Sequence, residues 1–345
     1  MFKGNLEACV SLITTGVRFV ELNRFAEQMR MSLFSSTFFW KVFSIAKPAI
    51  ETVYCRHEDH IVEVVRSHYE GESGLQMATD GAYDSRGYST SIGKVDFSDT
   101  LTKLILRTEV LHCSETDEIS QRMEIEGLRR LLRWISAKGL RVASLTTDRS
   151  RSVGKLLREM EEETGVIQHY YDGWHLVKWL GNELLKVSKK RGCALLLERH
   201  RHRNVGARSQ LDIPPIFNTC LMHVRDVHEW EEEDITGSYN CCSHGELVGP
   251  RPETLPLDSD AYQAFRDIVS TKSFQRDLAK ASPCGGTSIC GTKHALDRLY
   301  CRKEIFYPVM LDSHKDCFDS DQLPDEIGEM MMAEKASESG YSVEL

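Results

Sequence analysis

Residues 101–148 decide the fold, and three parts of this stretch carry the pattern: LTKLILRTEVL (101–111), MEIEGLRRLLRWISAK (123–138) and LRVASLTTD (140–148). The first part is rich in leucine and β-branched residues and predicts a strand. The second part places apolar residues at helical spacing and stops before Gly139, a residue type common at helix C-termini. The third part predicts another strand, which ends at Asp148. The stretch therefore indicates strand, helix and strand in succession.

The neighbouring segments extend this order on both sides. Upstream, Leu75–Thr79 and Tyr88–Phe97 predict two more strands, the first ending in the turn signal Asp80-Gly81. Downstream, Ser150–Thr164 predicts a charged helix and Val166–Tyr171 a short strand. Three strands that can form an antiparallel meander, followed by crossover units, are the plan of a ribonuclease-H-like α/β sheet. We therefore predict a mixed sheet of this kind.

The rest of the chain divides around this sheet. We predict a helical N-terminal segment at 1–70, the first part of the core at 71–175, a mostly helical insertion at 176–283, a core return helix at 284–310 and an acidic disordered tail at 311–345. In the first segment, Ser35-Ser36-Thr37 is expected to cap the second of two or three helices. A helix-turn-helix and an ordinary small helical subdomain both fit that segment.

The composition excludes a wholly disordered chain, because 41% of the 345 residues are hydrophobic. By a prior of roughly 100–200 residues per domain, the length suggests about two structural units. No run of roughly 18 apolar residues is present, so we expect no membrane span. The eleven cysteines lack the spacing of a small disulfide scaffold, and the first residues do not resemble a secretory leader. Both features indicate a reducing compartment.

The net charge of −9 is unevenly distributed along the chain. Between Leu311 and Leu345 ten acidic residues stand against two lysines, so this segment carries eight of the nine net negative charges. The remaining chain is nearly neutral and contains a basic stretch, Lys186–Arg208, with eight Lys or Arg residues and one acid. The acidic sum therefore does not argue against a DNA partner.

The basic stretch is the candidate contact to DNA phosphates. The residues predicted to make this contact are Lys186, Lys189, Lys190, Arg191, Arg199, Arg201 and Arg203. A solvated helix face followed by a loop is the structural alternative, and a nuclear import signal is a second functional one. We expect the protein in the nucleus or the cytoplasm.

Three aspartates stand where the chain leaves predicted strands: Asp80, Asp148 and Asp172. Ligands of α/β sheets gather at strand ends, so these carboxylates are candidates to hold divalent metal ions. Each one also has an ordinary structural explanation. Asp80 precedes a glycine and is suited to a turn, whereas Asp148 and Asp172 precede helices and are suited to cap them.

Four motifs together resemble the core of eukaryotic cut-and-paste DNA transposases. They are TDGAYDSRGYS (Thr79–Ser89), TTDRS (Thr146–Ser150), YDGWHLVK (Tyr171–Lys178) and TSICGTKHALDRLYCRKEIFY (Thr287–Tyr307). The resemblance runs over residues 15–310 and is strongest to the Kolobok-like elements, whose relatives often carry a zinc-dependent THAP domain. No Cys/His-rich zinc module precedes residue 70 in this chain.

The resemblance implies a DDE-type centre in which acids coordinate two Mg²⁺ or Mn²⁺ ions. Asp80 matches the first acid of the family and Asp148 the second. The third, a glutamate three residues before a histidine matched here by His294, is replaced by Gly291. We therefore expect impaired strand cleavage and transfer. Asp172, on a strand next to that of Asp148, is a candidate substitute ligand.

The same family resemblance points to two further candidate sites. His175 lies three residues after Asp172 and either contacts substrate DNA or packs at a helix start. The pair Cys242-Ser243-His244 resembles a Cys-x-His pair of the family's insertion. Cys241, His228 and Cys220 are further potential ligands, but their spacing fits no standard zinc pattern. Zinc is therefore not expected.

The leading hypothesis is thus a transposable-element-derived, DNA-transposase-like protein with weakened chemistry. A domesticated, non-catalytic DNA- or protein-binding module is the alternative. A metal-dependent nuclease acting through the three aspartates is a third option, and assembly into a homo-oligomer stays open.

Overall fold

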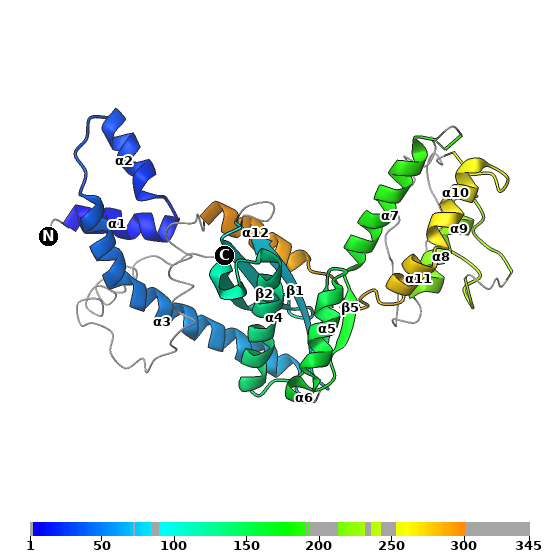
Figure 1. Cartoon of the computed structure of the whole chain (residues 1–345), viewed down its shortest axis with the longest axis horizontal. Coiled ribbons are helices and arrows are strands. Elements are labelled where there is room, and N and C mark those ends of the chain that lie inside the picture. Colours follow the sequence, from blue (N-terminus) through cyan, green and yellow to red (C-terminus); the bar gives the residue numbers. More distant parts are fainter. Residues whose placement is uncertain are drawn as a thin grey trace, which may run out of the picture.

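The computed structural model describes residues 3–71, 73–84, 90–190, 192–193, 213–231, 236–242 and 253–300. It contains a five-stranded mixed sheet, and helices precede and follow the strands along the chain (Figure 1). The prediction of an α/β fold with a mixed sheet is confirmed. None of the helices in these ranges combines the length and the apolar character that crossing a bilayer requires. The predicted acidic tail lies outside the described residues.

The sheet has the strand order β3-β2-β1-β4-β5. Its strands are β1 (Leu75–Tyr83), β2 (Ile92–Asp99), β3 (Ile105–His112), β4 (Val142–Thr147) and β5 (Gln168–Tyr171). The first three strands pair antiparallel, while β4 runs parallel to β1 and β5 parallel to β4. This is the predicted meander followed by crossover connections.

The first strand is longer than the sequence predicts. Asp80 and Gly81 do not form a turn, because β1 continues to Tyr83 in antiparallel pairing with β2. Its parallel pairing with β4, in contrast, reaches only as far as Ala78 opposite Thr146. The turn interpretation of Asp80 is therefore wrong, and Asp80 lies inside a strand at the point where β4 departs.

Helices α4 (Ser120–Ala137), α5 (Arg151–Glu159) and α6 (Glu161–Thr164) follow the crossovers of the sheet. The predicted single helix at 150–164 is thus divided in two. Helix α4 lies close on β2, because a Cβ placed at Gly127 would come within 2.6 Å of Val95 Cγ2. Leu128, Leu131 and Leu132 are fully buried in the core that α4 shares with the sheet.

The N-terminal segment consists of α1 (Lys3–Thr15), α2 (Phe19–Gln28) and the long α3 (Ser36–His68). Ser35 caps α3 by accepting a hydrogen bond from the Phe38 amide at 3.2 Å, as predicted. The first half of α3 packs with α1 in a separate hydrophobic cluster that includes Phe39. Its second half joins the sheet core through Ile61 and Val65.

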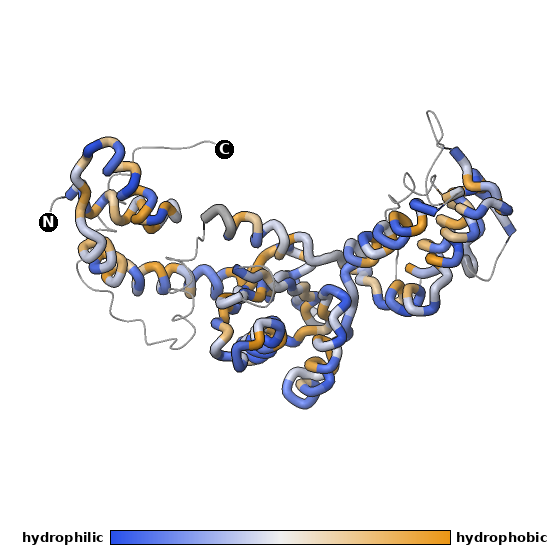
Figure 2. Tube along the Cα trace, turned by 45° about the horizontal axis from the view of Figure 1, so that its top comes forward, coloured by the Kyte–Doolittle hydropathy of each residue, from blue (hydrophilic) through white to orange (hydrophobic). Residues whose placement is uncertain are grey.

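The insertion contains α7 (Gly173–Ser188), α8 (Ile213–Asn218), α9 (Cys220–His223), α10 (Asp260–Val269) and α11 (Lys272–Leu278). Helix α7 begins at Gly173, three residues before the predicted boundary. These helices bury their own hydrophobic cluster, separate from that of the sheet. They and the N-terminal helices lie on opposite sides of the sheet unit (Figure 2).

The chain returns to the sheet by way of a parallel bridge between Ala281 and Tyr171, the last residue of β5. It then forms α12 (Ser288–Tyr300), which packs on β1 and β2. Cys290, near the start of α12, is fully buried and lies 3.3 Å from the Ser98 hydroxyl of β2. A return helix is therefore present within the predicted range 284–310, of which 301–310 lie outside the described residues, and it covers the strand that carries Asp80.

Candidate metal and DNA site at the end of the sheet

The sheet brings two of the three predicted aspartates together. Ala78 of β1 and Thr146 of β4 are partners in the parallel register. Asp80, inside β1, and Asp148, just after β4, each follow two residues later, so they lie at the same level of the sheet. Asp148 is not the cap of the following helix, because Ser150 occupies that position. Its Oδ1 is buried and has no hydrogen-bond partner among the described residues.

A third carboxylate, from Glu124 of α4, joins this pair and was not predicted. Gly81 lies beside it, since a Cβ at Gly81 would be in van der Waals contact with Glu124, 3.4 Å from its Cγ and 3.5 Å from its Cδ. Glu124 thus lies directly against β1 next to the residue that follows Asp80. In the sequence, Glu124 is one of two acids on a charged amphipathic helix, and only its neighbour Met123 indicates the inward side.

Two of the three carboxylates, Glu124 and Asp80, have raised pKa values. Burial, together with the charges of Asp148 and Asp80, raises the pKa of Glu124 to about 7. Burial also raises the pKa of Asp80, with Asp148 adding to the shift and His294 and His175 partly offsetting it. Nearby Tyr83 has its pKa raised to about 12 by burial and by the same three acids. A cluster of mutually repelling carboxylates is the electrostatic setting that a divalent cation relieves.

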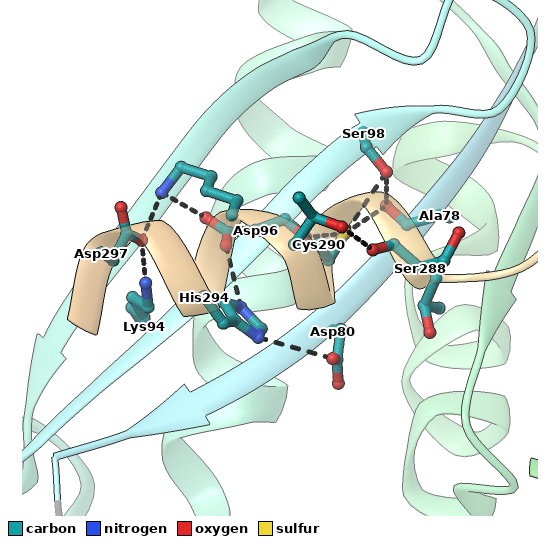
Figure 3. A network of polar contacts seen from close by, with 12 residues as sticks. Ala78, Asp80, Lys94, Asp96, Ser98, Ser288, Cys290, His294 and Asp297 are labelled. Atoms are coloured by element: carbon teal, nitrogen blue, oxygen red, sulfur yellow. Dashed lines mark hydrogen bonds and ion pairs between the residues drawn. The ribbon is translucent and has the colours of Figure 1, made fainter. Parts of the chain in front are cut away.

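His294 of α12 connects Asp80 to a second acid, Asp96 of β2 (Figure 3). Its Nε2 lies 2.8 Å from Asp96 Oδ2, and its Nδ1 lies 3.6 Å from Asp80 Oδ2. Lys293 contacts Asp96 at 3.1 Å and Asp297 at 2.8 Å, and Asp297 in turn pairs with Lys94. This network holds α12 on the sheet and fixes the imidazole beside Asp80.

Gly291 lies one helical turn before His294. Residues three positions apart share a face of a helix, so both lie on the same side of α12. No atom lies within 4 Å of a Cβ built at this position. The space for a longer side chain is therefore present, while the carboxylate that the family resemblance implies is not.

Asp172 has a different role from the one predicted. It caps α7, with Oδ1 accepting from the Trp174 amide at 2.9 Å. Its Oδ2 accepts from both the backbone amide and the hydroxyl of Thr287, at 3.1 and 2.7 Å. A Cβ at Gly286 would come within 2.5 Å of Oδ1, so the chain closes tightly around this carboxylate. The capping interpretation is confirmed, and the geometry gives no support to Asp172 as a substitute metal ligand.

His175 lies on the first turn of α7, and its charge lowers the pKa of Asp80. Its ring packs against Trp174 with the centroids 4.9 Å apart. Trp174 is 60% exposed, and the ammonium of Lys178 lies over its ring, 4.6 Å from the centroid. An exposed aromatic ring and a cation thus lie next to the histidine at the edge of the carboxylate cluster.

The basic residues predicted to contact DNA are described only in part. Lys186, Lys189 and Lys190 lie at the C-terminal end of α7 and are exposed. Lys186 pairs with Glu183 at 2.6 Å. Arg191, Arg199, Arg201 and Arg203 lie outside the described residues.

Comparison with known proteins gives no match to a protein-family model, to a curated protein or to a solved structure. The family resemblance of the four motifs therefore stays a prediction.

Proposed function

We propose that this protein is a DNA-transposase-like phosphoryl-transfer protein with a ribonuclease-H-like core, in which Asp80, Asp148 and Glu124 hold divalent metal ions. The carrying observation is the convergence of these three carboxylates, from β1, the end of β4 and α4. The strand order and the return of α12 onto β1 are compatible with that fold.

The donor set fits Mg²⁺ or Mn²⁺. All three groups are carboxylates, the hard oxygen ligands that these ions prefer. The buried, unpartnered Oδ1 of Asp148 and the raised pKa values of Asp80 and Glu124 indicate a site in which positive charge is lacking. Bound metal ions would supply charge stabilisation to both the attacking and the leaving oxygen of a DNA phosphodiester.

The residues around the carboxylates have separate tasks in this proposal. His294, held by Asp96, fixes the orientation of the Asp80 carboxylate. His175, Trp174 and Lys178 form the approach to the site, where an imidazole and an ammonium contact phosphate and an exposed ring stacks on a base. Gly291 supplies no carboxylate where the family resemblance implies a glutamate. In this proposal Glu124 supplies the third carboxylate instead, and we expect slow cleavage.

The test is Mn²⁺- or Mg²⁺-dependent nicking of supercoiled plasmid DNA by the full chain. Asp148→Asn should lower the rate by at least about 10²-fold, because one positioned charge is lost at the reacting phosphate. Glu124→Gln should lower it comparably. Asp172→Asn, which preserves a capping side chain, is the matched control and should retain nicking. A nicking rate that is unchanged in Asp148→Asn would refute the proposal.

A non-catalytic DNA-binding module is the second candidate, favoured by the missing carboxylate at Gly291 and the exposed lysines of α7. It predicts salt-dependent DNA binding without nicking. Replacing Lys189 and Lys190 together by glutamine should reduce the slope of log affinity against log salt by up to about 2, since each phosphate contact contributes about 0.9. Fluorescence anisotropy at several salt concentrations measures this slope, and an unaltered slope would argue against these contacts.

A further inference from the structure

A separate group of metal-ligating side chains lies in the insertion, among residues that the carboxylate site does not use. His223 is the last residue of α9, and His228 follows after a turn in which Asp226 adopts a positive φ of 60°. Two short segments then run antiparallel. The Trp230 amide donates to the Asn240 carbonyl at 2.9 Å, and the Cys242 amide donates to the His228 carbonyl at 3.0 Å. This pairing brings Cys242 to the two histidines.

The three side chains have the geometry of a small metal site. Ligand atoms of His223, His228 and Cys242 all lie within 4.8 Å of one another. The Nδ1 of His223 lies 3.6 Å from the Cys242 Sγ. With Zn–S near 2.3 Å and Zn–N near 2.05 Å, a tetrahedral ion separates its sulfur and nitrogen ligands by about 3.6 Å. The observed separation therefore equals one edge of a zinc tetrahedron.

A carboxylate orients one of the two imidazoles. Asp226 Oδ1 lies 2.9 Å from the Nε2 of His228. A carboxylate on one ring nitrogen fixes the tautomer of a ligating histidine and leaves the other nitrogen to the metal. His228 would accordingly ligate through Nδ1, from the opposite edge of its ring.

We propose that His223, His228 and Cys242 bind a Zn²⁺ ion that joins the end of α9 to the paired segments of the insertion. One thiolate and two imidazoles are borderline-soft donors that suit Zn²⁺ and do not suit Mg²⁺. A fourth ligand, water or another side chain, completes the coordination. The site stands apart from the proposed carboxylate centre, and its occupancy does not depend on whether the protein cleaves DNA.

Spacing alone did not predict this site. The two histidines are separated by four residues, whereas Cys242 follows His228 by fourteen positions, which matches no standard zinc-finger pattern. The antiparallel pairing of 228–230 with 240–242 removes this separation. The sequence-based expectation against zinc therefore gives way to the opposite proposal.

The experiment uses Co²⁺ as a spectroscopic substitute for Zn²⁺ in the full-length chain. The background is Asp80→Asn with Asp148→Asn, so that the carboxylate site does not add to the stoichiometry. A thiolate site gives a sulfur-to-cobalt charge-transfer band in the near ultraviolet, which carboxylates cannot produce. We expect one equivalent of Co²⁺ to give this band and one equivalent of Zn²⁺ to remove it.

The variants separate ligands from neighbours. Cys242→Ser should abolish the charge-transfer band, and His223→Ala and His228→Ala should each weaken Zn²⁺ binding by at least about 100-fold in competition with a chromophoric chelator. Asp226→Asn, which tolerates the positive φ, should weaken it by about 10- to 100-fold. Cys242→His keeps a ligand at the same position and should lose the band while retaining Zn²⁺, which rules out a mere folding defect.

Cys241→Ser is the matched control, because Cys241 is the exposed neighbour of Cys242 and does not belong to the cluster. It should retain the band and the affinity. The proposal is overturned if the parent with Asp80→Asn and Asp148→Asn binds no thiolate-linked Co²⁺, if Cys242→Ser keeps the band, or if the histidine variants bind Zn²⁺ as tightly as this parent. The two proposals can fail separately. A chain that binds Zn²⁺ at this site without nicking DNA would overturn only the proposed function, and a chain that nicks DNA without binding Zn²⁺ here would overturn only the zinc site.

Discussion

Asp80 and Asp96 are direct cross-strand partners on β1 and β2, and the same histidine contacts both, yet their pKa values move in opposite directions. Burial would raise the pKa of Asp96, but hydrogen bonds from His294 and Thr108 and the charge of Lys293 lower it to about 2. For Asp80, burial and the charge of Asp148 outweigh the opposing effect of His294 and His175, and its pKa is raised.

The difference lies in where the counter-charge comes from. On the β2 side the protein supplies its own cations, and the network of Lys94, Lys293 and Asp297 closes on itself. On the β1 side three carboxylates converge and the described residues contribute only imidazoles. The first arrangement is built to hold α12 in place. The second is expected to gain stability from an added cation, as the proposed metal site requires.

The largest effect in this comparison is expected from breaking the self-compensated side. Asp96→Asn removes the 2.8 Å partner of His294 and one of the two carboxylates that Lys293 contacts, and removal of one partner from a buried ion pair destabilises a protein by about 3–5 kcal/mol. Urea unfolding at pH 7 measures the loss. In Asp96→Asn with Lys293→Met the loss should be smaller, because the ammonium that lost its Asp96 partner is gone. Equal losses in the single and double variants would contradict the proposed pairing.

The same acid gives a pH signature of known sign. The folded pKa of Asp96 is lowered from 3.8 to about 2, so its ionised form stabilises the fold above pH 4. That contribution, about 2 kcal/mol, is lost as the pH falls through the range from 4 to 2. The acid limb of the stability curve should flatten in Asp96→Asn.

The uncompensated side should respond in the opposite direction. The folded pKa of Glu124 is raised from 4.5 to about 7, so its ionisation destabilises the fold as the pH rises through this range. At pH 8 without divalent ions, Glu124→Gln should therefore stabilise the protein by up to about 3 kcal/mol, and the gain should vanish below pH 4.5. Thermal unfolding across pH measures it.

Mg²⁺ supplies the control for this prediction. Wild-type protein should gain thermal stability when Mg²⁺ is added at pH 8, because a bound ligand stabilises the folded state. Glu124→Gln should gain less, and Asp172→Asn should gain as much as wild type. A stabilising effect of Glu124→Gln that persists at pH 4 would show that charge repulsion is not its cause.

The sheet could be predicted from the sequence because its pattern is local. Alternating apolar residues, the capping glycine after α4 and the serine before α3 each act within a few residues of chain. Placing Asp80 and Asp148 near the ends of neighbouring strands was enough to predict that they lie close together. The strand bounds were less accurate: the pairing of β1 with β2 continues past the Asp80-Gly81 turn signal, and β2 and β3 each begin four residues later than predicted.

The rest of the site depends on contacts between distant parts of the chain. Glu124 is one of two acids on a polar helix, and it packs beside Gly81 of β1, a residue more than forty positions away in the sequence. Asp172 was predicted as a substitute metal ligand because it follows a strand. Its carboxylate instead accepts hydrogen bonds from the amide and hydroxyl of Thr287, 115 positions away. Spacing along the sequence contains neither fact.

Asp172 provides a third way to sharpen the comparison, because it is an acid compensated by hydrogen bonds. Asp172→Ala removes the cap of α7 and leaves the donors of Thr287 without their acceptor. A lost cap destabilises by about 1 kcal/mol and an unsatisfied buried donor by about 1–3 kcal/mol, so we expect a loss of about 2–4 kcal/mol in urea unfolding. Mg²⁺ affinity at the carboxylate cluster should stay unchanged. A large drop in that affinity would restore Asp172 as a ligand.

The smallest effect is expected at Gly291, where a single added side chain can bring another carboxylate toward Asp80. Gly291→Ala should stabilise α12 by about 0.5–1 kcal/mol, because glycine is the more flexible residue in a helix and no atom lies close to the added Cβ. Gly291→Glu gains similar helix stability but adds a carboxylate on the side of α12 that carries His294. At pH 8 without divalent ions, repulsion from Asp80 should cancel the gain, and Mg²⁺ should restore it. Thermal unfolding of both variants with and without Mg²⁺ measures this difference. If the two variants respond identically to Mg²⁺, the helix position before His294 does not face the carboxylate cluster, and the loss of the third acid at Gly291 cannot explain slow cleavage.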